Sequence, residues 1–318
     1  MKTFAKLLLL VSTSLMGFSH TYAQEWPTKP VKFVVPYNAG GGLDMMCRTV
    51  AERLATVVKQ PVVVENKVGA SGTIGSAYVA KSAADGYTIL CANNSDLTLA
   101  QFIIPKLSYS PEKDFLPLVM AVKQTVFLVG NAAVPATDAA QLIELSKKSP
   151  LAYANPGLGS NTTLAMEMFN AASKANFISV PYTGVALTDV ISGQVPLTVF
   201  NLAPLLPHIK AGKLKPYVVF QSERHPSFPD IPTAREAVGV DVVAASWFGF
   251  FAPVGTPQGI TRQLEQGIRT VLADPATVAV LSKAEMQIVG MPSTDFSKVI
   301  VAERAYHQRL VQRFNAAK

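Results

Sequence analysis

Short apolar runs alternate with longer amphipathic stretches along most of the chain, and each such pair predicts a buried strand followed by a helix. In the first pair, residues 31–35 form the apolar run, and apolar positions then recur at helical spacing through Leu54 and Val57. Strands and helices in alternation predict an α/β protein with a mostly parallel sheet and right-handed crossovers.

The same pattern continues to the end of the chain. We predict further strands at residues 62–65, 87–92, 115–119, 126–129, 151–154, 177–180, 195–201, 215–220 and 247–252. We predict further helices at residues 73–81, 138–148, 164–172, 257–272 and 297–314, and a helix end at 208–212.

A run of three glycines, Gly40, Gly41 and Gly42, follows the first predicted strand, and Asp44 comes just after it. A helix N-terminus carries free backbone N–H groups and about half a positive charge. Glycines let a ligand approach that backbone closely, so this loop is a candidate anion-binding position. The alternative is a tight turn with Asp44 as its cap, and the pattern alone does not separate the two.

Two further polar loops follow predicted strands. Residues 155–163, Asn-Pro-Gly-Leu-Gly-Ser-Asn-Thr-Thr, enter a predicted helix and repeat the arrangement of residues 33–57, which suggests two similar domains facing each other. Residues 93–96 form a polar loop at another strand end. Open α/β sheets bind ligands at the carboxyl ends of their strands, where these loops lie.

The N-terminus is typical of a signal peptide covering residues 1–23. Lys2 and Lys6 precede an apolar run at 7–18 that is too short for a membrane span, and Thr21-Tyr-Ala23 fits a cleavage site. We therefore expect an exported, soluble mature protein. Cleavage removes the two lysines and lowers the net charge from +7 to +5. Because no basic run interleaved with aromatic residues appears, the sequence does not favour nucleic-acid binding, and we expect no nucleic-acid partner.

The chain has two cysteines, Cys47 and Cys91. An oxidising compartment permits a disulfide. The predicted elements place one cysteine on the first helix and the other at a strand end. We expect two buried free thiols rather than a bond.

Candidate catalytic and metal-binding residues are few. None of His208, His225 and His307 has a metal-ligand spacing partner, and no Gly-x-Ser-x-Gly motif occurs. The glycine run lacks the Lys-Ser/Thr of a phosphate-binding loop, and it fails the dinucleotide pattern at Met45. We therefore expect no metal, no cofactor and no enzymatic activity.

Many short stretches together resemble the extracytoplasmic solute-binding proteins of tripartite tricarboxylate transporters, the Bordetella uptake (Bug/TctC-like) family. The stretches are Trp26-Pro-Thr-Lys-Pro-Val31, Phe33-Val-Val-Pro36, Gly40-Gly-Gly with Asp44, Gln60-Pro-Val-Val-Val-Glu-Asn66, Asp85-Gly-Tyr-Thr88, Lys113-Asp-Phe115, Val180-Pro-Tyr182 with Gly184, Gly193-Gln-Val195, Leu206 to Leu214, Asp230-Ile-Pro-Thr233 and Ser246-Trp-Phe-Gly249. They span nearly the whole mature chain.

This resemblance implies a two-lobed α/β fold of the periplasmic binding protein type II kind, with central mixed sheets and a ligand cleft between the lobes. Residues 24–122 would form the first part of lobe 1, residues 123–246 lobe 2, and residues 247–318 the rest of lobe 1 with the C-terminal helices. The chain would cross between the lobes near 121–125 and 245–250.

In the family, backbone N–H groups, hydroxyls, amides and waters hold a carboxylate between the lobes. Carried over residue by residue, the resemblance implies binding by residues of both lobes. These are Tyr37, Asn38, Gly40, Gly41, Gly42, Leu43, Asp44, Asn94, Ser95, Ser160, Asn161, Thr162, Tyr182, Thr183, Gly184 and Asn201. For each of them the alternative is a local role, because Asn and Ser at turns often bond their own backbone.

The sequence departs from the family pattern at several of these positions. The family commonly has an aromatic or proline residue with a second proline where Tyr37-Asn38-Ala39 stand, and Thr often stands in place of Leu43. Residues 184–189 form a shorter segment without a proline. An Asp-Asn pair is common where Phe200-Asn201 stands. Fewer polar groups and an added Phe suggest a partly apolar ligand, such as a monoaromatic carboxylate or dicarboxylate.

The sequence therefore predicts a periplasmic, monomeric, non-enzymatic binding protein that captures a small carboxylate and delivers it to membrane transporter subunits. Two alternatives stay open. The protein could present its ligand to a membrane sensor, or it could be an enzyme on the same fold, with His208 as the residue to test.

Overall fold

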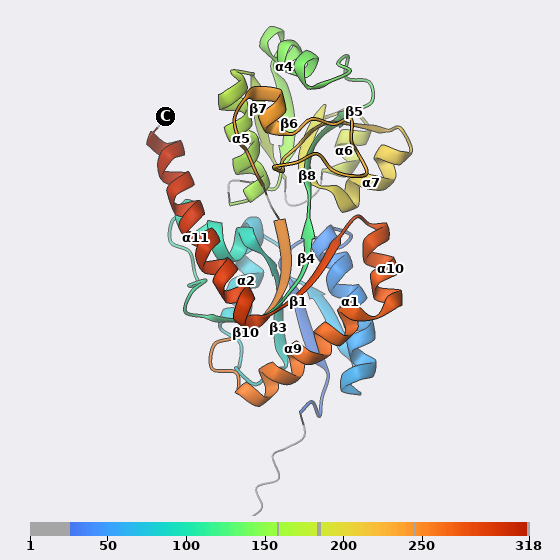
Figure 1. Cartoon of the computed structure of the whole chain (residues 1–318). Helices are drawn as coiled ribbons and strands as arrows, with labels where there is room; N and C mark the ends of the chain where they lie inside the picture. Colours follow the sequence, from blue (N-terminus) through green and yellow to red (C-terminus); the bar gives the residue numbers. More distant parts are fainter. Residues whose placement is uncertain (1–25, 158, 183–185, 245, 317–318) are drawn as a thin grey trace, which may run out of the picture.

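The computed structural model describes residues 26–157, 159–182, 186–244 and 246–316. Figure 1 shows that these residues form two α/β units, one above the other. The predicted signal peptide at residues 1–23 lies outside the described residues.

Each unit is built on one β-sheet. The first unit holds a six-stranded sheet in the order β11-β4-β10-β3-β1-β2, and the second unit holds a five-stranded sheet in the order β7-β6-β8-β5-β9. The strands are β1 (Val31–Val35), β2 (Val62–Asn66), β3 (Thr88–Asn93), β4 (Phe115–Gln124), β5 (Val126–Asn131), β6 (Leu151–Asn155), β7 (Phe177–Pro181), β8 (Leu197–Asn201), β9 (Leu214–Val219), β10 (Ser246–Pro253) and β11 (Gln287–Pro292).

Both sheets are mixed, so the prediction of a mostly parallel sheet was wrong. In the first sheet β1 is parallel to β2 and β3, but β10 is antiparallel to β3 and β4, and β11 is antiparallel to β4. In the second sheet β6 is parallel to β7 and β8, whereas β5 is antiparallel to β8 and β9. Local periodicity does not reveal which distant strands become neighbours. The fold class expected from the resemblance, with two units of mixed sheet, is confirmed.

Most predicted helices are present. The α-helices are α1 (Gly42–Val58), α2 (Thr73–Ala80), α3 (Ala100–Ile103), α4 (Ala139–Lys148), α5 (Asn161–Ser173), α6 (Leu187–Ile191), α7 (Leu202–Lys210), α8 (Ala234–Val238), α9 (Gln258–Ala273), α10 (Pro275–Lys283) and α11 (Ser293–Ala316). The predicted polar loop at 93–96 instead runs into a π-helical turn, Ser95–Leu99. Helix α5 begins three residues earlier than predicted, and α10 and β11 were not predicted.

Helices cover both faces of each sheet. In the first unit α1, α9 and α10 pack on one face, while α2 and the first turns of α11 pack on the other. In the second unit α4, α5 and α8 cover one face, and α6 and α7 cover the other. The inner strands β1, β5, β8 and β10 are almost fully buried, which explains why they read as continuous apolar runs, whereas β2, β7 and β11 are mostly half-buried or exposed.

The two units are connected by the main chain and by helix α11. Strand β4 passes into β5 through Thr125, whose carbonyl accepts a hydrogen bond from Leu202 N at 2.9 Å. The 24-residue helix α11 runs alongside both units (Figure 1), and its Val311 packs with Leu99 of the first unit and Leu164 of the second. Across the described part of the chain, no helix combines the length and apolar character that a bilayer crossing needs.

An aromatic cluster joins β10 to α11. The ring of Trp247 contacts that of Phe296 edge-on, with 4.8 Å between centroids, and Phe251 lies against both rings. The indole N–H of Trp247 donates to Glu303 Oε2 at 2.7 Å. Burial raises the pKa of Glu303 to about 7, although the Trp247 hydrogen bond acts in the opposite direction. This cluster fixes the start of α11 on the strand that returns from the second unit.

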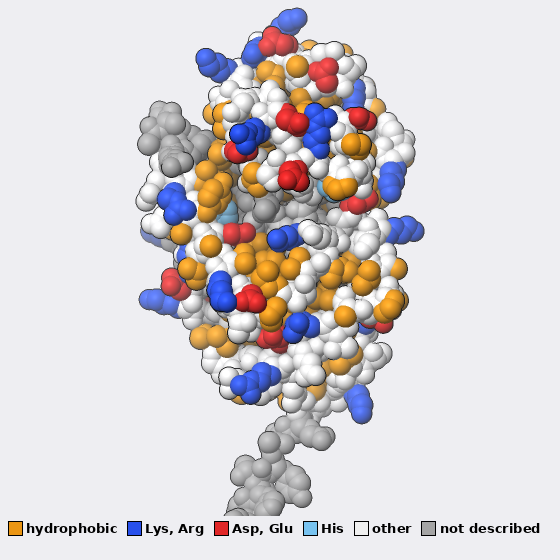
Figure 2. Space-filling view, viewed as in Figure 1, with side chains coloured by type: hydrophobic (Ala, Val, Ile, Leu, Met, Phe, Trp, Pro, Cys, Tyr) orange, Lys and Arg blue, Asp and Glu red, His pale blue; other side chains and the backbone are white. Residues whose placement is uncertain are grey.

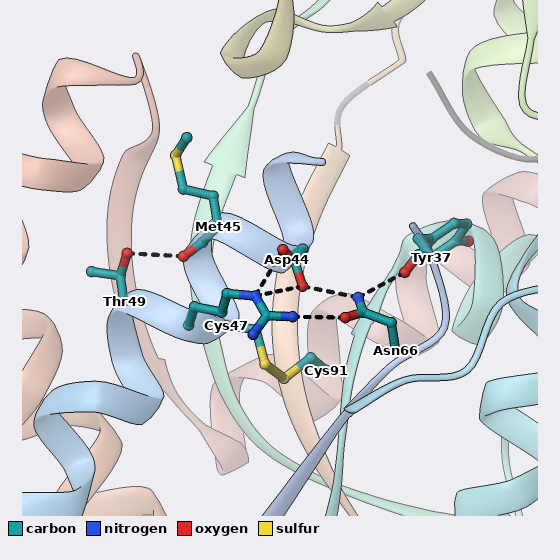
Figure 3. Close-up of a disulfide and its surroundings, with 8 residues drawn as sticks. Tyr37, Asp44, Met45, Cys47, Thr49, Asn66 and Cys91 are labelled. Carbon is teal, nitrogen blue, oxygen red and sulfur yellow. Dashed lines mark hydrogen bonds and ion pairs between the residues drawn. A yellow bond between two sulfur atoms is a disulfide. The ribbon is translucent and has the colours of Figure 1, made fainter. Parts of the chain in front are cut away.

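Cys47 and Cys91 form a disulfide, so the expectation of two free thiols was wrong. Their Cα atoms lie 6.4 Å apart, and neither residue is exposed (Figure 3). The bond joins α1 to β3. Helical periodicity predicted that Cys47 would be buried, but it did not show that the strand beneath it would be the one carrying Cys91.

Candidate ligand-binding site

A cavity of about 270 Å³ lies between the two units. Its walls come from segments that follow β1, β3, β6 and β8, at the carboxyl ends of these strands. The lining residues are Tyr37, Asn38, Ala39, Gly40, Gly41, Gly42, Leu43, Asp44, Asn93, Ser95, Pro156, Ser160, Asn161, Thr162, Leu187, Phe200, Asn201, Pro204 and Phe248. This is the position where open α/β sheets bind ligands.

Helix α1 begins at this cavity without a side-chain cap. Its N-cap residue is Gly41, which offers no side chain to the first N–H groups. Gly42 is tightly packed, because a Cβ there would lie 3.2 Å from Gln124 Oε1 and 3.3 Å from the Phe248 ring, so these side chains would have to shift slightly. The N-terminus of a helix 17 residues long therefore faces the cavity with its backbone donors uncapped.

Asp44 lies in the first turn of α1 and is not the N-cap of this helix, but its side chain bonds the glycine turn, as the alternative of a local role expected. Its carboxylate accepts hydrogen bonds from Arg48 Nε at 3.0 Å and from Asn66 Nδ2 at 2.9 Å (Figure 3). It also accepts from Gly40 N at 2.9 Å. Asn66 Nδ2 also donates to the carbonyl of Tyr37. This network neutralises Asp44 and fixes the glycine loop.

The pKa of Asp44 reflects the same contacts. Burial alone would raise this pKa, but the hydrogen bonds from Arg48, Gly40 and Asn66 outweigh burial and hold it below its usual value. The carboxylate therefore stays ionised and paired. Although Asp44 lines the cavity, its charge is already balanced within the first unit.

Helix α5 begins at the opposite wall and is capped by its own residues. Ser160 Oγ accepts from Thr162 N at 3.3 Å, and the two hydroxyl oxygens lie 2.8 Å apart. Behind them, Asn155 Oδ1 accepts from Gly157 N and from the hydroxyl of Thr163. This N-terminus is thus held by uncharged side chains.

Hydrogen bonds connect the two walls directly. The hydroxyl of Ser95 in the first unit donates to Asn161 Oδ1 and accepts from Asn161 N, both at 3.1 Å. Ser71 Oγ donates to the carbonyl of Pro156, also at 3.1 Å. With these contacts in place, the cavity is enclosed between the units.

The rest of the lining is mainly apolar. Leu187, Phe200 and Pro204 come from the second unit, and Phe248 comes from β10. None of the lining residues is a lysine, arginine or histidine. In Figure 2, basic and acidic side chains are interspersed over the visible face, without a block of one sign.

Of the sixteen residues predicted to bind ligand, twelve line this cavity. They are Tyr37, Asn38, Gly40, Gly41, Gly42, Leu43, Asp44, Ser95, Ser160, Asn161, Thr162 and Asn201. Their contact with a ligand remains a prediction.

Of the other four, the two that the structure describes do not line it. Asn94 lines a separate cavity beside α11, and Tyr182 lines another, where its hydroxyl donates to Asp189 Oδ2 at 2.8 Å. Thr183 and Gly184 lie outside the described residues. His208, the candidate for catalysis, lies on α7 and does not line the cavity.

Sequence reasoning missed seven lining residues, which are Ala39, Asn93, Pro156, Leu187, Phe200, Pro204 and Phe248. Asn93 could have been included, because it opens the polar loop that follows a predicted strand. Phe200 was noted as a departure from the family but was not assigned to the site. Leu187 and Pro204 belong to no motif, and they reach the cavity only because of how the units meet.

Tyr37 connects the cavity wall to a buried carboxyl group. Its hydroxyl donates to Asp96 Oδ1 at 2.8 Å, and Asp96 has no exposed surface. Burial raises the pKa of Asp96 to about 7, although the Tyr37 hydrogen bond acts in the opposite direction. The Tyr37 hydroxyl is therefore used inside the first unit. Among the described residues, no three His, Cys, Asp or Glu side chains are grouped as a metal site would require.

Comparisons with known proteins identify the class. The pattern of the tripartite tricarboxylate transporter family receptor matches residues 46–316, and the chain therefore belongs to this family of solute-binding proteins. The resemblance seen in the sequence is thereby confirmed.

Individual relatives agree over almost the full length. The chain is 32% identical over 302 residues to Protein BugT of Bordetella pertussis, covering 93% of this chain and 92% of BugT. Among solved structures, R. palustris Rpa4515 with adipate has a TM-score of 0.85 at 32% identity, covering 91% of this chain and 98% of Rpa4515. MatC from Rhodopseudomonas palustris with bound malate also has a TM-score of 0.85, at 29% identity, covering 90% of this chain and 100% of MatC.

Proposed function

We propose that this protein is a periplasmic, non-enzymatic binding protein that captures a small organic carboxylate and passes it to the membrane subunits of a tripartite tricarboxylate transporter. One observation carries the proposal. The N-termini of α1 and α5 approach a single cavity from opposite units, and none of the described residues that line it is cationic. Oriented backbone dipoles can replace the hydration of an anion in such an enclosed site.

The proposed mechanism is closure around the ligand. Residues 24–122 and 247–318 would form one lobe and residues 123–246 the other, with the hinge near Thr125. A carboxylate that contacts both walls binds the closed arrangement better than an open one, and this difference in affinity drives the closure. The Ser95–Asn161 contact supports this view, because it exists only while the walls meet.

Location and assembly belong to the same proposal. Residues 1–23 would direct export and then be removed, and the mature protein would work as a monomer without a cofactor. The relatives that bind malate and adipate support a small carboxylate as the ligand. The buried disulfide supports an oxidising compartment such as the periplasm.

The first experiment is native mass spectrometry of the purified mature protein, followed by a thermal-shift screen of organic acids. We expect a bound or added acid to raise Tm, since a ligand that binds only the folded state stabilises it. The double variant Ser160→Ala/Asn161→Ala should weaken acid binding by about 10-fold or more while the protein remains folded.

The matched control is Asn176→Ala/Ser282→Ala, which changes the same residue types at exposed positions away from the cavity. It should bind acids like the unmodified protein. If the Ser160/Asn161 variant binds acids with unchanged affinity, the cavity is not the binding site and the proposal is wrong.

A further inference from the structure

Three helices begin at the cavity, and they differ in what their N-termini can still offer a ligand. At α5, Thr162 N donates to Ser160 Oγ and Asn161 N donates to Ser95 Oγ. Two of its first N–H groups are therefore already used by side chains. An anion would have to displace these bonds in order to bind there.

The third helix, α7, is short of donors at its start. Leu202 N donates to the carbonyl of Thr125 at 2.9 Å, and Pro204, which lines the cavity, has no N–H group. Its N-cap residue is Asn201, whose side chain makes no capping bond. This end of the cavity therefore holds few backbone donors for an anion.

Helix α1 remains. It has no side-chain cap at Gly41, and Gly41, Gly42 and Leu43 all line the cavity. The nearby charge of Asp44 is balanced by Arg48. Since no lysine, arginine or histidine lines the cavity among the residues that the structure describes, this N-terminus is the strongest site there for negative charge.

Asn201 provides an independent sign that the cavity takes a ligand. It is 8% exposed, it lines the cavity, and among the described residues its Oδ1 has no hydrogen-bond partner. An amide oxygen accepts hydrogen bonds, so this atom can serve one hydroxyl or N–H group of a ligand. It brings no charge, so it does not compensate a second carboxylate.

The remaining walls suit an apolar body. Leu187, Phe200 and Pro204 form one surface, and Phe248 lies next to Gly42 at the α1 end. The volume of about 270 Å³ is below the range of roughly 300–1,000 Å³ found for drug-sized ligands. The ligand is therefore small.

We infer that the cavity selects a monocarboxylate over dicarboxylates of the same length. The mainly apolar body of this ligand would be about the size of that of hexanoate or benzoate and would carry at most one hydrogen-bond donor, for Asn201 Oδ1. The carboxylate lies at the N-terminus of α1, and the body lies against Leu187, Phe200 and Pro204. This inference rests on the proposed function and narrows its ligand class. It separates this protein from relatives whose structures contain malate or adipate.

The test compares matched acids by isothermal titration calorimetry with the mature protein. Hexanoate and adipate share a six-carbon chain, and benzoate and terephthalate share a ring, so each pair differs by one carboxylate. We expect the monocarboxylate of each pair to bind about 100-fold more tightly, because the second charge would be buried without compensation. The R. palustris relative whose structure contains adipate serves as the positive control for the adipate solution.

Two variants test the assignment of the apolar wall. Phe200→Lys places a positive charge on that wall and should reduce the preference for hexanoate over adipate at least about tenfold. Val301→Lys adds the same charge at a residue that is 63% exposed on α11, and it should leave the preference unchanged. If Phe200→Lys does not fold, Leu187→Lys replaces it.

The outcomes are distinct. Tighter binding of both monocarboxylates, with the shift in Phe200→Lys, supports the inference. Adipate or terephthalate binding as tightly as its partner, or equal effects of both lysine variants, overturns the inference and leaves the proposed function standing. If none of the four acids and no acid of the wider screen binds, the proposed function itself fails.

Discussion

Helices α1 and α5 begin on opposite sides of the cavity. They arise from the same strand–loop–helix arrangement, but different contacts hold their N-termini in place. Each follows a strand and a glycine-containing loop at the carboxyl edge of its sheet. Helix α1 has an open N-terminus and is fixed by groups behind it, which are the disulfide and the Asp44 network. Helix α5 is capped by Ser160 and contacts the opposite wall through Asn161.

This difference suggests that the two helices have different roles in binding. The α1 side is held rigid within its own unit, so its backbone donors keep their positions whether or not a ligand is present. The α5 side uses its donors for its own cap and for the other unit, so it supports closure more than direct charge recognition. Preorganised donors bind a charge without paying for reorganisation at the moment of binding.

The largest effect is expected from closing the open helix end. In Gly41→Asp the new carboxylate would cap α1 and bring a negative charge to the cavity. Gly41 has φ −73° and ψ 164°, and its Cβ would meet only Asn38 O at 3.5 Å, so the backbone tolerates the change. We expect acid affinity, measured by calorimetry, to fall about 1,000-fold, because the new carboxylate would repel the carboxylate of the ligand.

The control is Gly41→Asn, which offers a similar cap without the charge. It should lose at most about tenfold in affinity and keep the same Tm within a few degrees. Equal binding by Gly41→Asp and the unmodified protein would show that the α1 end does not receive the carboxylate.

A smaller effect is expected from removing the covalent link behind α1. The double variant Cys47→Ala/Cys91→Ala removes a disulfide between residues 44 positions apart. We expect the free energy of unfolding to fall by about 2–4 kcal/mol. Urea denaturation measures this loss. Acid affinity should also fall, since α1 would no longer be fixed to β3.

The comparison would be weakened if the cysteine variant lost stability but bound acids unchanged. That result would mean that the Asp44 network alone is enough to position the open helix end. Reduction of the unmodified protein under denaturing conditions, followed by refolding with and without reductant, provides a second measurement of the same link.

The smallest effect concerns pH. The pKa of Asp44 is held below its usual value, so its contribution to stability is complete above the usual carboxyl pKa and is lost as the pH falls through the lower folded value. Asp44→Asn should therefore show a shallower loss of stability in urea titrations from about pH 5 to about pH 2.

The corresponding change at α5 is Thr163→Val, which removes a hydrogen bond to Asn155. None of the hydroxyl and amide groups in that network titrates in the acid range. The variant should lose the same stability at every pH, and a steeper acid slope in Thr163→Val would contradict the difference drawn between the two helix ends.

Much of the fold could be predicted from local pattern. Strands such as β1 and β6 are buried on both faces and read as apolar runs, and both helices of the cavity follow glycine loops. β11 was missed because its residues are mostly half-buried, without a clear apolar run. The π-helical turn was missed because it depends on Asn93 Oδ1 accepting from Ser95 N, a bond that composition does not show.

The site could be predicted only in part, because local sequence marks some of its residues and not others. Loop residues such as Gly41 and Ser160 are marked by local sequence, and the structure brings them together across the cavity. Leu187 and Pro204 carry no such mark, because their place in the wall is set by the way the units meet. Tyr182 matched a family motif, yet it lies at a different cavity and bonds Asp189.

The position of Trp247 has a practical consequence. The chain has only two tryptophans, and Trp26 packs on Tyr87 within the first unit. Trp247 lies at the start of the strand that enters from the second unit, bonded to Glu303. Its partners Phe296 and Glu303 both lie on α11, so intrinsic fluorescence gives an optical signal of how this helix is attached to β10, without any attached dye.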